Sequence, residues 1–306
     1  MISLDDDLSQ LVLDSNSTPL SLEHTLNCGQ VFRWEKKNKY WYGIVDEKVI
    51  KLRQEDNILY YKIFPEDKGD SLIQRYLRLD DDLPGIITKI DKDLTIKKTI
   101  NAFYGLRIVR QNIWECLISY ICATFSNIPR IKGMIRNLSK KFGKEISYDG
   151  LTFYTFPTID ALTKATSGEL LDCRLGFRAT YIKGAVNKIK SSQNDFDFKY
   201  LKRLSYLEAK RHLLTIPGVG PKVADCILLF SLDKLESFPV DVWIKRILSM
   251  YYDYNFPNRK FLEKKEITSS RYNELSAFGR RYFGEYAGYA QEYLYHYYRL
   301  NRLFIP

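Results

Sequence analysis

The sequence predicts an α+β protein in which an N-terminal antiparallel sheet with short helices is followed by a mainly helical domain. Two observations carry this prediction. Apolar and polar residues alternate in short runs between residues 30 and 64, and after about residue 105 the apolar residues recur at helical spacing. The chain has 306 residues, which is enough to bury one large core or two smaller ones. We therefore expect a sheet domain over residues 1–105 and a helical domain over residues 106–306.

Three runs define the expected strands, namely residues 40–45, 49–52 and 58–64. They are rich in Tyr, Trp, Val and Ile and are separated by short polar turns, as in an antiparallel meander. Two short helices are expected after them, over residues 70–79 and 85–93, packed on one face of the sheet.

The second half of the chain shows apolar stripes spaced for helices. One stripe consists of Ile113, Leu117, Ile118 and Ile121, and the next of Ile131, Ile135 and Leu138. The remainder of this half is expected to consist of helices joined by short loops.

Charge is unevenly distributed along the chain. Residues 1–100 hold 15 Lys and Arg against 18 Asp and Glu, a net −3, whereas the other residues hold 32 against 19, a net +13. A basic half favours a polyanionic partner, because neutralising phosphates releases counterions. A solvated lysine-rich surface would give the same count, so charge alone leaves both interpretations open.

Composition also bounds the class of protein. The sequence has no apolar run long enough to span a bilayer, so no membrane association is expected. Five cysteines without a Cys-x-x-Cys pair argue against a disulfide framework and against zinc. The acidic first seven residues lack the features of a secretory or transit signal. We expect a protein that is not secreted, located in the cytoplasm or nucleoid of a prokaryote or in the nucleus of a eukaryote.

The most informative local pattern is the turn at residues 214–221, Leu-Thr-Ile-Pro-Gly-Val-Gly-Pro. Pro217 is expected to end one helix, and Pro221 to preset the first turn of the next. Gly218 and Gly220 permit positive φ and a close approach of the backbone. The free N–H groups at such a helix start form a natural seat for a phosphate.

The segments at 216–226 and 238–241 closely resemble the helix-hairpin-helix DNA glycosylases, and among them the 8-oxoguanine DNA glycosylase family. Further matches extend the resemblance to both ends of the chain, at residues 28–34, 110–116, 174–178 and 284–291. Related branches of the superfamily carry a four-cysteine iron–sulfur loop, which this sequence lacks. The resemblance therefore implies an enzyme without a cofactor or a metal.

In this family Lys222 would be the nucleophile and Asp241 the anion beside it. Breaking an N-glycosidic bond develops positive charge at C1′, so the site needs a nearby carboxylate and a group that captures the sugar. A lysine serves only as the free amine, which desolvation or the field of a helix N-terminus favours. Asp241 also suits a simple N-cap of the helix at 242–248, and both roles are compatible. A solvated phosphate contact is the alternative for Lys222.

The resemblance assigns four residues to the extruded base. Cys226, one helical turn beyond Lys222, would pack on one face of the base and Tyr295 on the other, while Gln291 would meet its Watson–Crick edge. Gly29 would offer its carbonyl to the N7–H that 8-oxoguanine has and guanine lacks. A small buried cysteine and an ordinary turn glycine are the alternatives.

Five positions concern the opposite base and the DNA backbone. Phe125 stands where relatives have an Asn that contacts the orphaned cytosine, and Phe177 replaces a Tyr that wedges beside it. Trp243 replaces a phosphate-contacting His. Arg130 and Arg178 match the two arginines that read cytosine. We therefore expect cleavage chemistry to be intact and the preference for cytosine to be graded rather than strict.

The sequence is thus interpreted as a monomeric bifunctional DNA glycosylase and apurinic/apyrimidinic lyase that acts on double-stranded DNA containing 8-oxoguanine. One alternative is an alkylated-base glycosylase of the same superfamily, which generally lacks the lysine at position 222. The other is a non-catalytic helix-hairpin-helix DNA-binding protein, which has no use for a matched Asp241, Cys226 and Gln291.

Overall fold

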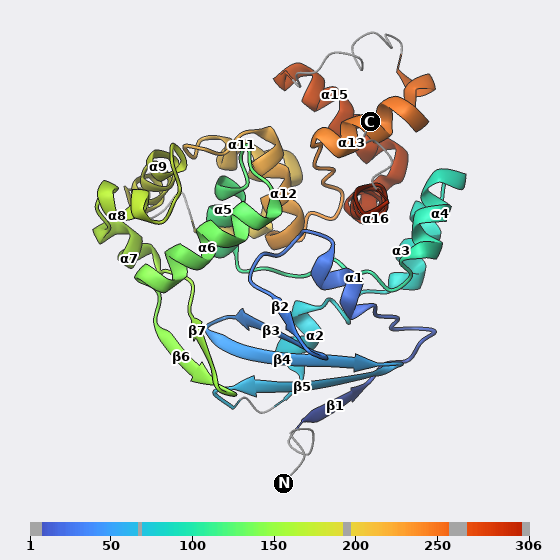
Figure 1. Cartoon of the computed structure of the whole chain (residues 1–306). Helices are drawn as coiled ribbons and strands as arrows, with labels where there is room; N and C mark the ends of the chain where they lie inside the picture. The colour runs from blue at the N-terminus through green and yellow to red at the C-terminus, as the bar shows by residue number, and fades with distance from the viewer. Residues whose placement is uncertain (1–7, 67–68, 192–196, 257–267, 302–306) are drawn as a thin grey trace.

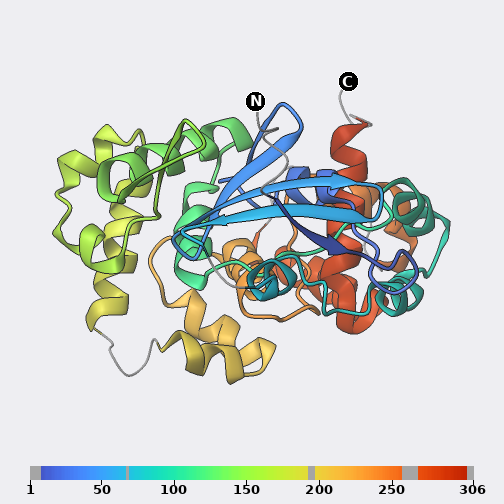
Figure 2. The same ribbon diagram turned by 90° about the horizontal axis from the view of Figure 1, so that it is seen from below.

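The computed structural model describes residues 8–66, 69–191, 197–256 and 268–301. A sheet lies at one end of the molecule, and two groups of helices stand on it (Figure 1). Viewed from the sheet side, the groups lie on either side of its strands (Figure 2). Across these residues, no helix combines the length and apolar character needed to cross a membrane.

The sheet has five antiparallel strands in the order β1-β5-β4-β3-β2. The strands are β1 (Ser9–Val12), β2 (Glu35–Lys37), β3 (Tyr40–Val45), β4 (Lys48–Glu55) and β5 (Ile58–Phe64). The three predicted strands are confirmed, with β4 longer than expected at both ends. Asp46 and Glu47 both have positive φ, as a two-residue hairpin turn between β3 and β4 requires.

One face of the sheet packs against α1 (Leu22–Asn27) and α2 (Ser71–Tyr76). The indole of Trp34 is buried in this layer and donates to the hydroxyl of Tyr76 at 2.7 Å. Gly43 makes room for that indole, because a Cβ at this position would lie 2.3 Å from the Trp34 ring. The glycine in β3 is therefore required by close packing.

The first helical group covers one side of the molecule (Figure 1). Its helices are α5 (Ile113–Cys122), α6 (Ile128–Phe142), α7 (Ile159–Lys164), α8 (Ser167–Asp172), α9 (Arg178–Ser191), α10 (Phe198–Arg203), α11 (Tyr206–Leu214) and α12 (Pro221–Ser231). The two predicted stripes lie on α5 and α6 and face a common core.

The second helical group combines segments from both ends of the chain. Its members are α3 (Leu83–Ile90), α4 (Leu94–Ala102), α13 (Val242–Tyr251), η1 (Asp253–Asn255), α15 (Ser269–Phe283), η2 (Gly284–Tyr286) and α16 (Ala287–Leu300). The expected helix at 85–93 corresponds to α3, but α3 and α4 pack on α16 and not on the sheet. Their apolar residues complete the helical core, so expecting both short helices on the sheet was wrong for α3.

A hairpin interrupts the helical half, contrary to the expectation of helices alone. It is formed by β6 (Glu145–Tyr148) and β7 (Leu151–Tyr154), joined by Asp149-Gly150 with positive φ at both residues. Asp149 accepts hydrogen bonds from Tyr42 at 2.6 Å and from Lys51 at 2.9 Å, both on the sheet. The hairpin thereby ties the first helical group to the N-terminal sheet (Figure 1).

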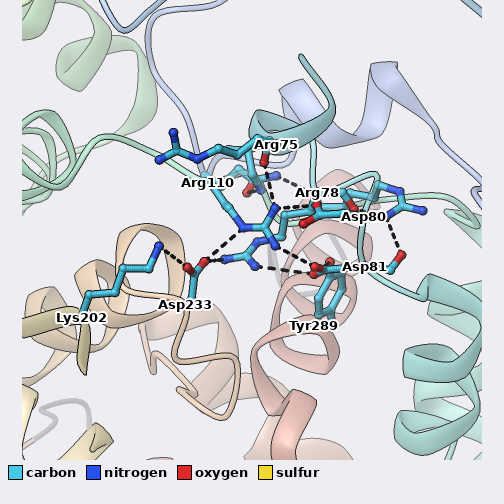
Figure 3. Close-up of polar contacts among 11 residues, drawn as sticks. Arg75, Arg78, Asp80, Asp81, Arg110, Lys202, Asp233 and Tyr289 are labelled. Carbon is cyan, nitrogen blue, oxygen red and sulfur yellow. Dashed lines mark hydrogen bonds and ion pairs between the residues drawn. The ribbon is translucent and has the colours of Figure 1, made fainter. Parts of the chain in front are cut away.

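A charged cluster joins the N-terminal segments to the end of α12 (Figure 3). We call it the Asp233 cluster: Asp233, just after α12, pairs with Arg78, with Arg110 at 3.3 Å and with Lys202 at 2.5 Å. Arg110 also binds Asp81 at 2.9 Å. Because Arg78 is almost fully buried, its charge depends on these carboxylates for compensation.

Candidate active site

A cavity of about 730 Å³ opens between α5, α6, α12, α13, α16 and the turn after α1. It brings together residues that lie far apart in the sequence. Among the predicted residues it is lined by Gly29, Phe125, Gly218, Gly220, Lys222, Cys226, Asp241, Trp243, Gln291 and Tyr295. Arg130, Phe177 and Arg178 do not line it. Convergence of a lysine, a carboxylate and an aromatic ring on one hollow marks it as the candidate active site.

The turn before α12 has the expected shape, with one difference. Gly218 has φ of +83°, and a Cβ there would lie 2.6 Å from Cβ of Tyr181, so both conformation and space require glycine. Gly220 is extended instead, with φ of −90°, and a Cβ there would meet no atom within 4 Å. The expectation of positive φ was therefore wrong for Gly220, which serves as the N-cap of α12, while the close approach of a phosphate to its backbone stays a prediction. Pro221 occupies the first helical turn as predicted.

Lys222 lies in the first turn of α12, where its ammonium nitrogen sits 4.9 Å from the centroid of the Tyr120 ring. Tyr120 stacks on Phe230 and donates from its hydroxyl to the carbonyl of Gln30 at 3.2 Å, so its ring is fixed. An aromatic face beside the lysine removes water from one side of the amine. The side chain of Lys222 is thereby positioned at the wall of the cavity, within reach of a bound ligand.

Cys226 follows Lys222 by one helical turn, and its thiol is buried. Burial raises the pKa of Cys226 to about 12, although the charge of Lys222 and a hydrogen bond with it act against that shift. The group is therefore a neutral thiol at physiological pH. A neutral, polarisable sulfur suits packing against a base and does not suit nucleophilic attack.

Asp241 is the N-cap of α13, as the sequence predicts. Its carboxylate accepts hydrogen bonds from the backbone N–H of Trp243 at 3.0 Å and of Ile244 at 2.9 Å. Burial raises the pKa of Asp241, and the two N–H donors together with the charge of Lys222 act against that rise. The residue is thus a cap whose charge also faces the cavity, and the two roles coexist.

Helix α16 supplies one wall of the cavity. Gln291 and Tyr295 are one turn apart on it, and both face the hollow. Gln291 is buried, and its Oε1 has no hydrogen-bond partner among the described residues. An unsatisfied buried acceptor destabilises the free protein, and a ligand that donates a hydrogen bond to it removes this penalty.

The turn carrying Gly29 is held against the same helix. Gly29 has φ of +105°, in the region that favours glycine, and an ideal Cβ there would lie 3.4 Å from Tyr295. Arg299 of α16 donates to the carbonyls of Asn27 at 2.8 Å and Cys28 at 3.2 Å. The arginine therefore fixes the approach of the Gly29 turn to Tyr295.

The loop between α5 and α6 carries Phe125 at the rim of the cavity. Phe125 is 90% exposed and has φ of +49°, an uncommon conformation for a bulky residue. Strained and exposed aromatic residues persist where surrounding contacts impose them, and they concentrate at functional sites. Trp243 also lines the cavity.

Arg178 is turned inward, against the loop that carries Phe125. Its guanidinium is 3% exposed and donates to the carbonyl of Thr124, to that of Phe125 at 3.1 Å and to that of Leu175 at 3.3 Å. Arg178 therefore supports the Phe125 loop, and its contact with the opposite base stays a prediction. Phe177 lies beside it, half exposed, 4.4 Å from the guanidinium, and Arg130 is exposed at the start of α6.

A buried carboxylate outside the cavity lining anchors α12. Asp225 is fully buried and accepts from Tyr206 at 2.7 Å, Lys210 at 2.8 Å and Tyr272 at 2.6 Å. It lies between Lys222 and Cys226 in sequence, and its carboxylate is engaged by side chains of the neighbouring helices. The network fixes the rotation of α12, and so fixes which side chains enter the cavity.

The sequence interpretation did not assign Tyr120, Glu292 or Arg299, although all three line the cavity. The ring of Tyr120 lies 4.9 Å from the nitrogen of Lys222, although about a hundred residues separate the two in sequence. Glu292 and Arg299 lie on the same helix as Gln291, and helical spacing from Tyr295 could have identified Arg299. Within the described ranges, no group of three or more His, Cys, Asp and Glu is placed to hold a metal ion.

Comparison with known proteins gives one consistent family. The N-terminal domain of 8-oxoguanine DNA glycosylase matches residues 12–117. The N-glycosylase/DNA lyase of Arabidopsis thaliana is 33% identical over 91% of this chain and 77% of its own length. The N-glycosylase/DNA lyase of Saccharomyces cerevisiae is 33% identical over 92% of this chain and 84% of its own.

Solved structures agree with these relatives. The Clostridium acetobutylicum 8-oxoguanine glycosylase/lyase in complex with double-stranded DNA containing cytosine opposite 8-oxoguanine superimposes with a TM-score of 0.83 at 32% identity, covering 97% of this chain and 99% of that one. A 3-methyladenine DNA glycosylase from Archaeoglobus fulgidus gives a TM-score of 0.74 at 19% identity, covering 96% and 99% of the two chains. The second likeness shows a shared fold alone.

Proposed function

This chain belongs to the 8-oxoguanine DNA glycosylase and lyase family, and we propose that it excises 8-oxoguanine from duplex DNA and then cleaves the abasic strand. One observation carries the proposal. The amine of Lys222 and the carboxylate of Asp241 line the same cavity as Gln291, Tyr295 and the thiol of Cys226. An amine, an anion and a stacking surface are the groups that base release with capture of the sugar requires.

The reaction begins with extrusion of the damaged nucleotide into the cavity. The nitrogen of Lys222 attacks C1′ as the bond to the base breaks, and the charge of Asp241 stabilises the positive charge that develops on the sugar. The adduct opens to a Schiff base between Lys222 and C1′. β-Elimination of the 3′ phosphate then cuts the strand.

Lesion selection rests on groups that surround the base. The ring of Tyr295 and the sulfur of Cys226 enclose the base, and Gln291 offers an unsatisfied acceptor to its edge. The carbonyl of Gly29 accepts from N7–H of 8-oxoguanine, whereas N7 of guanine would oppose it with a second acceptor. In a dry pocket such an unpaired contact discriminates strongly.

We propose a graded preference for cytosine opposite the lesion. The exposed ring of Phe125 fills the gap that the extruded nucleotide leaves but offers no hydrogen bond to the orphaned base. Arg178 is engaged by the loop carbonyls, which leaves Arg130 as the exposed cationic candidate for contact with cytosine. A single good contact is worth about 1–3 kcal/mol, so preference without absolute dependence is expected.

Borohydride trapping on duplexes with one 8-oxoguanine opposite each of the four bases tests the proposal. The wild-type protein should form a covalent adduct, because a Schiff base is reducible, with rates graded across the four bases. Lys222→Gln should abolish the adduct and retain DNA binding in a gel-shift assay. Lys92→Gln, which removes an exposed lysine outside the cavity, is the matched control. Full trapping by the Lys222 variant would disprove the assignment.

Two further properties are proposed. We propose that the protein acts as a monomer on double-stranded DNA. We also propose that the protein resides with the DNA of the cell, in the nucleoid or the nucleus. The presence of Lys222 favours excision of an oxidised base with strand cleavage. The alkylated-base glycosylases, which share the fold, generally lack this lysine.

A further inference from the structure

Glu292 is a second carboxyl group in the cavity. It follows Gln291 on α16 and lines the same hollow as Lys222 and Asp241. The side chain is 2% exposed, and its Oε1 has no hydrogen-bond partner among the described residues. An isolated buried carboxylate costs much more than a buried carboxylic acid, so these surroundings favour the protonated form.

The groups around Glu292 come from four helices and the turn after α1. Burial raises the pKa of Glu292 to about 7, against a hydrogen bond with Cys28 and the charges of Arg299 and Lys222, while the charge of Asp241 adds to the rise. The titratable and charged groups that face it are Cys28, Tyr120, Lys222, Asp241, Tyr295 and Arg299. A carboxyl that titrates in the neutral range is suited to give and take a proton during turnover.

The environments of Glu292 and Asp241 differ. Asp241 accepts two backbone hydrogen bonds at a helix N-terminus, which stabilise its anion. The Oε1 of Glu292 receives no such donor among the described residues. The surroundings thus stabilise the anion of Asp241 more than that of Glu292, an asymmetry typical of sites that pair a carboxylic acid with an ionised carboxylate.

We propose that Glu292 is the general acid of base release, protonating the departing purine while Asp241 remains ionised and Lys222 attacks C1′. This assignment rests on the proposed excision activity and adds the group that makes the base a neutral leaving group. None of the sequence motifs identifies the position.

Protons and electrons balance in this base-release step. The bond between C1′ and N9 breaks, and its electron pair passes to the base. The O–H of Glu292 gives its proton to a ring nitrogen of the base and becomes a carboxylate. The lone pair of the Lys222 amine forms the new bond to C1′, and the resulting aminium can return a proton to Glu292. The base leaves with one added hydrogen, and no further reactant is needed.

Single-turnover release of 8-oxoguanine between pH 5.5 and 9 tests the assignment with Glu292→Gln, Glu292→Asp and a control, Glu285→Gln. Glu285 is an exposed carboxylate in η2 that pairs with Lys89, outside the cavity. Above the titration of the acid, the rate of wild-type base release relative to that of Glu292→Gln should fall by about tenfold per pH unit, because any pH dependence of the amine is common to both proteins. Glu292→Gln should be slower by about a hundredfold near pH 6.5 and should lack this limb. Glu292→Asp should keep the limb, and Glu285→Gln should match the wild type.

Borohydride trapping on a preformed abasic duplex separates chemistry from folding. That substrate has no base to protonate, so Glu292→Gln should lose far less there than on the intact lesion. Equal losses on the two substrates, or a wild-type limb that persists in Glu292→Gln, would overturn the role of Glu292. A wild-type protein that released another modified purine with the same limb, and no 8-oxoguanine, would instead overturn the proposed substrate.

Discussion

Replacing Phe125 by Asn should stabilise the free protein and sharpen its choice of opposite base. Phe125 has φ of +49° and is 90% exposed, so its ring buries little surface that would offset the backbone conformation. The left-handed conformation costs an L-residue about 1–2 kcal/mol, and Asn tolerates it because its short side chain bonds locally. We therefore expect the free energy of unfolding to rise by about 1 kcal/mol.

The same substitution restores an amide at the rim of the cavity. An amide can hydrogen-bond the orphaned cytosine, whereas a phenyl ring only fills the vacated stack. Since one specific contact is worth about 1–3 kcal/mol, the ratio of excision rates opposite cytosine and adenine should increase by about tenfold.

Urea unfolding and single-turnover excision opposite all four bases measure the two effects. Phe125→Ala is the control, because Ala keeps the left-handed cost and brings no amide. The reasoning would be refuted if the Asn variant were no more stable than the Ala variant, or if both showed the same selectivity. Either result would mean that the strain or the missing amide at Phe125 has been misjudged.

Three other substitutions test the site and its support. Asp241→Asn keeps a capping side chain and removes the charge, so single-turnover excision should fall by about a hundredfold or more while stability and DNA binding change little. An unchanged rate would reduce Asp241 to a cap. Tyr295→Ala should lose about 1–3 kcal/mol of base engagement and Tyr295→Phe very little, as measured by excision rate. Equal damage would assign the effect to the hydroxyl. Asp233→Asn should lower the free energy of unfolding by about 3 kcal/mol, because the buried Arg78 loses the nearer of its two carboxylate partners and keeps only Asp81 at 3.5 Å. Burial alone would raise the pKa of Asp233, but Arg78 and the neighbouring cations hold it below its ordinary value, so this stability is present near neutral pH and is lost as pH falls through the lowered value. A pH-independent difference between wild type and Asp233→Asn would contradict the assignment.

Elements with a strong local pattern could be predicted from the sequence. The strands at 40–45 and 58–64 occur at the predicted bounds, because alternation and turn residues are local properties. Helix α4 and the hairpin at 145–154 were missed. The hairpin carries an Asp149-Gly150 turn signal, but its strands are short, and contacts with the sheet stabilise it.

The candidate site divides in the same way. Lys222, Cys226 and Asp241 lie within or beside a distinctive turn, so their relative placement follows from short-range geometry and the resemblance. Glu292 gains its properties from burial among side chains of other helices, which no local pattern encodes. The inward orientation of Arg178 could not be predicted for the same reason, because it depends on the carbonyls of a loop some fifty residues earlier.

Helix α12 and the Phe125 loop are held in place by different kinds of contact. Helix α12, which carries the nucleophile, is held in its middle by the buried Asp225 network and beyond its end by the Asp233 cluster (Figure 3). The Phe125 loop instead keeps an exposed aromatic residue in a strained conformation, with Arg178 as its main polar support. Catalytic geometry benefits from rigid elements, whereas displacement of a base requires a residue that projects from the surface. Changes in the loop should therefore alter the choice of opposite base without disturbing the position of Lys222.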